Sequence, residues 1–219
     1  GQPDAAWLKH VCKLRRRRPI DAIVLVTDGD KDLPTQRRGT DAPGIRLARI
    51  AEILRWSAPI YALEVGPTSA SSIGDAPVVF CGMPGHANAR SVEAALQNLR
   101  CELSRRSLAQ LPQTGQERYL GKLSQRLDDR SKALAEWLAG LAGAARGQLP
   151  VRGVAFAPAF GLEGSQEVDT DLPIWQYLAD AARRQPGRHT AWHPLTICVW
   201  LALTAIGLWT AAMLISGLR

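Results

Sequence analysis

The sequence lacks the short motifs that mark many catalytic sites. It contains no GxxxxGK[ST] phosphate loop and no GxGxxG turn, which are two common signatures of nucleotide binding. It also contains no HExxH zinc motif and no GxSxG nucleophile motif. We therefore assign no catalytic residue, no cofactor and no cofactor-binding residue, and we expect that the chain is not an enzyme. An NTPase would need a phosphate loop from outside this sequence.

Cysteine is scarce, and its spacing excludes two further classes of protein. The four cysteines are Cys12, Cys81, Cys101 and Cys198, and none of them forms a CxxC pair. Zinc sites and disulfide frameworks both need closely and regularly spaced cysteines. The sequence therefore predicts reduced thiols.

Charge is missing from one long segment near the end of the sequence. Pro194–Leu218 carries no charged residue, and a helix of that length would be about 37 Å long, enough to cross a ~30 Å hydrocarbon core. A buried core helix is the alternative. Arg183, Arg184 and Arg188 precede the segment, and only Arg219 follows it. By the positive-inside tendency we predict a transmembrane helix with residues 1–190 in the cytoplasm.

Positive charge exceeds negative charge elsewhere in the chain. Lysine and arginine number 27 against 20 acidic residues, a net charge of +7. Much of the excess lies in Lys13 with Arg15–Arg18. Such a run can bind nucleic acid or acidic lipid headgroups, and it can also be a solvated helix end. Because no aromatic residue interleaves with these arginines, we predict no nucleic-acid partner.

The pattern of apolar residues predicts an α/β domain with a parallel sheet. Near-continuous apolar runs predict strands that are covered on both faces, and 3.6-residue periodicity predicts amphipathic helices. The predicted strands are Ile20–Thr27, Ile60–Val65, Pro77–Cys81 and Val151–Phe156. The predicted helices are Ala5–Arg17, Gly44–Trp56, Asn88–Gln110, Gln116–Ala145 and Ile174–Arg184. The first two strands are expected to be adjacent central strands of the sheet. Together with the helix between them they predict a right-handed βαβ unit, with Ile23, Leu25, Ile60 and Leu63 in the core.

The predicted organisation has three parts. Residues 1–184 form a cytoplasmic α/β domain with a helical part. Residues 185–193 form a juxtamembrane linker, and residues 194–218 form the transmembrane helix. The sequence has no initiator methionine, so we expect it to be a piece of a longer polypeptide.

Three carboxylates follow the first predicted strand. Asp28, Asp30 and Asp32 lie in the loop DGDKDLPTQRRG, which leaves the carboxyl end of that strand. Oxygen ligands at such an edge could hold Mg²⁺. In the alternative interpretation they cap the amides of a solvated turn. Because no Ser/Thr-rich motif elsewhere completes a coordination shell, we assign no metal ligand.

The segment IVLVTDGD…GIRLARIAEILRWSAPIYALEVG resembles the second half of a von Willebrand factor A domain. That family places a TDG turn after a central strand, and the resemblance implies that Asp28 helps to bind a divalent metal. The family's DxSxS metal motif is absent from this sequence. A membrane-anchored, metal-dependent binding module of this type is our alternative function.

A second resemblance covers nearly the whole sequence. The segments WLKHVCKLRRRRPIDAIVLV, RLARIAEILRWSAPIYALEV and LPVRGVAFAPAF, followed by the apolar segment near the end, resemble the cytoplasmic region of the IcmF/TssM family of type VI secretion proteins in composition and order. The resemblance implies a divergent fold similar to a small GTPase. It also implies a structural component of the secretion complex in the bacterial inner membrane, which this component links to the cytoplasmic baseplate. The implied partners are other membrane subunits, baseplate proteins, membrane lipid and further copies of the chain.

The family's nucleotide-reading motif has no counterpart here. Where [TN]KxD would follow a strand, this sequence reads Ala62-Leu63-Glu64-Val65-Gly66-Pro67, and the resemblance places the phosphate loop upstream of Gly1. We therefore transfer no nucleotide-binding residue from the family.

Overall fold

The computed structural model describes residues 4–29, 31–33, 42–66, 79–83, 87–109, 115–144, 149–158, 173–189 and 194–217. The chain divides into two compact units, Gly1–Arg188 and His189–Arg219, and each is described by itself. Asp30, one of the three carboxylates singled out above, lies outside the described residues.

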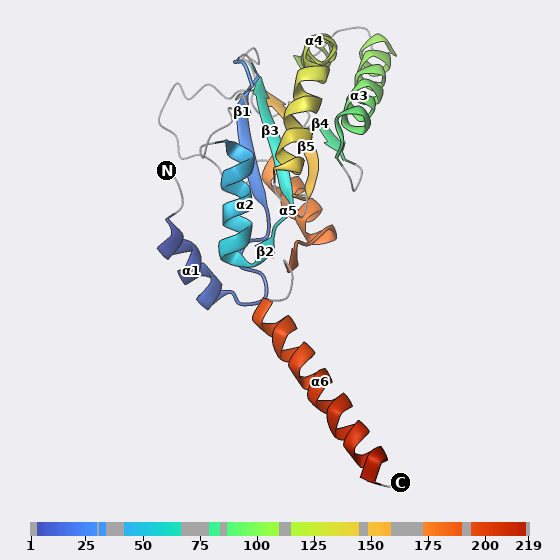
Figure 1. Cartoon of the computed structure of the whole chain (residues 1–219). Helices are drawn as coiled ribbons and strands as arrows, with labels where there is room; N and C mark the ends of the chain where they lie inside the picture. The colour runs from blue at the N-terminus through green and yellow to red at the C-terminus, as the bar shows by residue number, and fades with distance from the viewer. Residues whose placement is uncertain are drawn as a thin grey trace. The chain divides into compact units, whose positions relative to one another are not determined.

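A four-stranded, mostly parallel sheet lies at the centre of the first unit (Figure 1). The strands run in the order β1 (Ile23–Asp28), β3 (Ile60–Gly66), β5 (Val151–Pro158) and β4 (Val79–Gly82). The first three are parallel, and β4 is antiparallel to β5. The prediction of a mixed α/β domain built on a mainly parallel sheet is confirmed. The antiparallel direction of β4 was not predicted.

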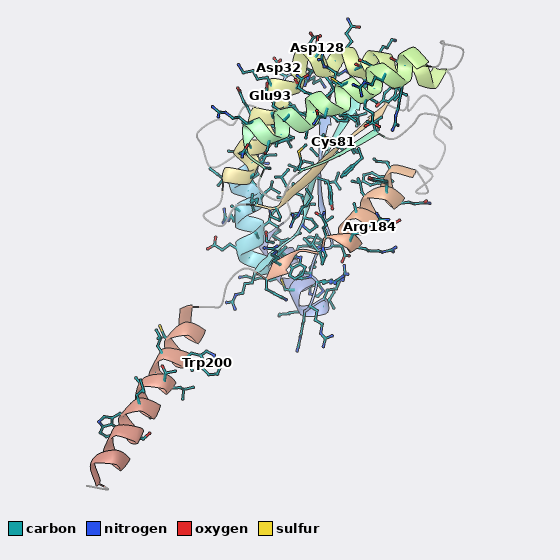
Figure 2. All side chains as sticks on the ribbon, turned by 90° about the vertical axis from the view of Figure 1, so that its right-hand side faces the viewer. Asp32, Cys81, Glu93, Asp128, Arg184 and Trp200 are labelled. Atoms are coloured by element: carbon teal, nitrogen blue, oxygen red, sulfur yellow. The ribbon has the colours of Figure 1, made fainter. Side chains whose placement is uncertain are left out.

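Helices cover both faces of this sheet. One face packs against α2 (Pro43–Leu54), α3 (Ala89–Ala109) and α4 (Gly115–Gly143), and Leu138 and Phe156 are fully buried there. The opposite face packs against α5 (Pro173–Arg184), where Leu178 lies with Tyr61 and Leu63. Figure 2 shows the strand that carries Cys81 between α5 and the α3–α4 pair. The two faces explain why β3 and β5 consist of near-continuous apolar residues.

A third cluster of buried side chains lies at the amino ends of the strands. Leu8 of α1 (Ala5–Leu14) packs there with Leu54 and Trp56. Trp56 belongs to β2 (Trp56–Ser57), which pairs with β6 (Arg188–His189) in a separate two-stranded sheet. The sequence predicted neither of these short strands.

The helices α1 and α2 end earlier than the sequence predicts. The α1 helix stops at Leu14. A longer helix would place the like charges of Lys13 and Arg17 four residues apart on one face, and Pro19 disfavours helical backbone at Arg18. The α2 helix stops at Leu54, and Arg55 closes it in the left-handed conformation with φ of 50°.

The prediction that Ile20–Thr27 forms a central strand is wrong for the described sheet. β1 lies at an edge with β3 as its neighbour, and Val26 is 61% exposed. Ile60 and Leu63 are buried as predicted, whereas Ile23 and Leu25 are only half-buried, because neighbouring chain covers β1 less completely than β3.

The second unit contains α6 (Pro194–Gly217). Its described side chains from Cys198 to Thr210 are exposed, and Trp200 is labelled in Figure 2. Searched over the described residues, no helix is both long enough and apolar enough for a membrane crossing. The helix at this place is confirmed, and its crossing of a membrane stays a prediction.

Candidate functional site

The carboxyl ends of β1 and β3 meet at one edge of the sheet and gather several polar groups. In parallel α/β sheets, ligands commonly bind outside this edge. Here the edge carries Gly29 directly after β1, Glu64 and Gly66 near the end of β3, and two arginines of α4, Arg126 and Arg130. The site is therefore built by three elements that are far apart in the sequence.

A buried ion pair lies at the centre of this edge. Glu64 is only 2% exposed, and its Oε1 atom lies 3.8 Å from Nη1 of Arg126, whose side chain is 19% exposed. An isolated carboxylate at this depth would lose most of its hydration, so a nearby guanidinium is needed to compensate for its charge. The pair ties α4 to the strand that forms the middle of the fold.

Two glycines leave room for the Arg126 guanidinium. A Cβ atom on Gly66 would lie 2.5 Å from Nη1 of Arg126, and one on Gly29 would lie 2.7 Å from the same atom. Both distances are shorter than a van der Waals contact allows. The absence of a side chain at these two positions therefore permits the arginine to reach Glu64.

The loop after β1 is held by further hydrogen bonds. The Gly29 amide donates to the Val65 carbonyl at 2.7 Å. Arg130 donates from Nη1 to the Gly29 carbonyl at 2.6 Å and from Nη2 to the Lys31 carbonyl at 2.8 Å. Arg126 and Arg130 of α4 thus both contact the chain where β1 and β3 end.

Tyr119 of α4 belongs to the same electrostatic environment. Burial raises the pKa of its phenol well above the ordinary value; Arg126 opposes the rise and Glu64 adds to it. The phenol therefore stays protonated at physiological pH and can act only as a neutral hydrogen-bonding group.

Asp28 and Asp32, the two carboxylates of the trio that the structure describes, do not gather into a metal site. Asp28 lies at the end of β1, where its Oδ2 atom forms an ion pair with Lys31 Nζ at 3.0 Å. Asp32 is exposed (Figure 2), and Asp30 lies outside the described residues. Over the described part of the chain, no three His, Cys, Asp or Glu side chains form a group that could hold a metal ion.

A small cavity of about 240 Å³ lies on the other side of the sheet, beside α5. Tyr61, Phe80, Tyr177, Arg152 and Arg184 contribute to its lining. Phe80 and Tyr177 are in ring contact, with centroids 4.9 Å apart, and burial raises the pKa of Tyr61. Pockets for drug-sized ligands usually measure about 300–1,000 Å³. This cavity suits a single side chain or small anion better than a nucleotide.

The sequence does carry one sign of the buried pair. Glu64 is the sole charge within the apolar strand IYALEVG, and such a residue needs a compensating partner when both faces of a sheet are covered. We did not identify Glu64 as a site residue, and nothing in the α4 sequence singles out Arg126 from the other arginines.

Comparisons of the chain with protein-family models, curated proteins and solved structures give no match. The functional argument therefore depends on the residues themselves.

The first prediction concerns the buried pair. Arg126→Met should lower the free energy of unfolding by about 3 kcal/mol, because it removes the guanidinium beside the buried Glu64 carboxylate. Glu64→Gln should be destabilising as well, and the double variant should lose at least about 1 kcal/mol less than the sum of the two single changes. Denaturant unfolding of the four proteins measures this coupling. Strictly additive losses would show that the two side chains do not interact.

The second prediction compares two glycines. Gly66→Ala should destabilise the fold, because the new methyl group would displace the Arg126 guanidinium. Gly121→Ala in α4 is the matched control, since no atom lies within 4 Å of the position that its Cβ would take. The control should stabilise the helix by roughly 0.5–1 kcal/mol. Thermal melts that shift in the same direction for both variants would argue against the close approach at Gly66.

Proposed function

We propose that this chain is a structural component of a type VI secretion membrane complex, which it anchors in the inner membrane and links to the cytoplasmic baseplate. The first support is the resemblance of its segments, in order, to the IcmF/TssM family. The second is the mainly parallel sheet, in which β1, β3 and β5 are neighbours in chain order. That arrangement is compatible with a divergent fold similar to a small GTPase.

The observation that carries the structural role is the position of Arg126. Its guanidinium lies against Gly29 and Gly66 at the carboxyl edge of the sheet, where enzymes with such sheets commonly bind ligands. The resemblance places the guanine-reading motif near the end of β3, where this chain reads Ala62-Leu63-Glu64-Val65-Gly66-Pro67. In this chain Glu64 of that segment forms the buried ion pair that joins α4 to β3. The edge therefore suits a rigid scaffold better than a nucleotide site.

The von Willebrand factor A-like module is the alternative proposal. It would use Asp28 as a metal ligand. The pairing of Asp28 with Lys31 gives this alternative no additional support, because an ammonium group at 3.0 Å competes with a cation for the carboxylate.

The proposed anchor is the charge-free segment Pro194–Leu218, which contains α6. The support comes from the sequence. The segment is free of charge over 25 residues, and Arg183, Arg184 and Arg188 precede it. We propose that residues 1–190 lie on the cytoplasmic side.

The third prediction tests the anchor with alkaline phosphatase fusions in a Gram-negative host. The enzyme should be active when fused after Arg219 and inactive when fused at Gln185, because it folds only in the periplasm. Activity at Gln185 would reverse the proposed orientation. Two inactive fusions, each present at normal abundance, would show that the segment does not cross the membrane.

The fourth prediction tests the function in a bacterium that carries this protein within a type VI secretion system. Deleting the protein should abolish release of the secreted tube subunit, and the wild-type chain should restore it. The Asp28→Asn variant should restore release to within about twofold of wild type, because replacing a half-exposed carboxylate of a scaffold changes its stability little.

Normal secretion in the deletion strain would contradict the proposed function. Loss of secretion in the Asp28→Asn strain, with the variant present at normal abundance, would favour the metal-dependent alternative.

A further inference from the structure

The basic run after α1 forms an open hollow on the surface of the first unit. Lys13, Leu14 and Arg15–Arg18 line a space of about 550 Å³, which we call the basic hollow. All six residues are exposed. Because the helix ends at Leu14, the four arginines lie on non-helical chain and can present their side chains together on one surface.

Most of this charge is not neutralised by neighbouring acids. Arg15 forms a two-bonded ion pair with Asp21, at 2.9 and 3.2 Å. In the described part of the chain, no ion pair or hydrogen bond engages the side chains of Arg16, Arg17 and Arg18. Three guanidinium groups are thus available to an anionic partner.

Trp56 brings a second basic segment to the same place. Its Nε1 atom donates to the Ile20 carbonyl at 2.9 Å, two residues after Arg18. A Cβ atom on Gly187, next to Arg188, would lie 2.8 Å from the ring of the same tryptophan. Ile20 and Gly187, which lie near opposite ends of the first unit in the sequence, therefore both contact the buried indole of Trp56. Arg188 is exposed and adds its charge to that of the basic hollow.

We propose that the basic hollow, together with Arg188, binds the phosphate groups of anionic membrane lipids. This inference rests on the proposed function only in assuming that the chain works at a membrane. The contact would be additional to the proposed anchor and would be made by the folded unit itself. It would hold the amino edge of the sheet against the bilayer surface.

Two observations favour lipid over nucleic acid as the anionic partner. Leu14 is 72% exposed within the hollow, and an apolar side chain among arginines suits the boundary between headgroups and acyl chains. Residues 189–193 alone separate Arg188 from α6, a contour length of about 20 Å. If α6 enters a bilayer, the chain must keep Arg188 near the headgroups.

The fifth prediction uses the fragment Gly1–Thr190, which contains both short strands and all the described core clusters but lacks α6. The fragment should sediment with phosphatidylethanolamine vesicles that contain phosphatidylglycerol and should not sediment with neutral phosphatidylcholine vesicles. Binding should weaken at raised ionic strength, because salt screens exposed charges. Arg16→Gln/Arg17→Gln should weaken it about 30-fold, at roughly 1 kcal/mol for each basic residue.

The matched control is Arg90→Gln/Arg105→Gln, which removes the same charge from exposed positions on α3. It should bind the anionic vesicles within about twofold of the unmodified fragment, if binding is local rather than a response to net charge. Equal losses in the two variants would overturn the site. So would tighter binding to duplex DNA than to the vesicles.

These results are distinguishable from those for the proposed function. The fragment lacks the anchor, so vesicle binding can succeed where the phosphatase fusions fail, and can fail where they succeed.

Discussion

The burial of the Glu64 charge is the constraint on which the carboxyl edge of the sheet depends. A carboxylate that is 2% exposed on a strand covered on both faces requires a cation nearby, and α4 provides Arg126. The guanidinium can reach its place only because residues 29 and 66 have no side chain. The ion pair joins α4 to β3, and Arg130 of the same helix holds the loop after β1. Such a pair is weak evidence for high stability, and we expect its main effect to be the choice of one arrangement of these elements.

The two edges of the sheet differ in chemistry. At the carboxyl edge, Arg126 lies where parallel α/β sheets commonly bind ligands, which suits the proposed rigid scaffold. The amino edge carries the indole of Trp56, and the basic hollow and Arg188 flank it. Positive charge that local acids do not neutralise lies at this second edge. The proposals follow this difference: a structural role for the closed carboxyl edge, and contact with an anionic bilayer for the amino edge.

The sequence predicts the elements of this fold better than its site. Long apolar runs such as Ile60–Val65 and strong helical periodicity identify strands and helices, because burial itself produces those patterns. The edge position of β1 was missed, since strand order depends on contacts between distant segments that a local pattern does not contain. The strands β2 and β6 are two residues each, too short for any periodicity. Asp28, Asp30 and Asp32 could be singled out from the sequence because carboxylates grouped after a strand are a recognisable pattern of metal ligands. The Glu64–Arg126 pair joins positions 64 and 126 through space, and only the folded chain brings them together.

The most direct test of the central claim is amide hydrogen exchange at Gly29, whose N–H donates to the Val65 carbonyl beneath the Arg126 guanidinium. Exchange should be slow in the unmodified protein and should speed up in Arg126→Met more than it does at Ile23, at the other end of β1, because the pair secures this edge locally. Equal acceleration at both amides would mean that the variant only lowers global stability. Unchanged protection at Gly29 would contradict the account.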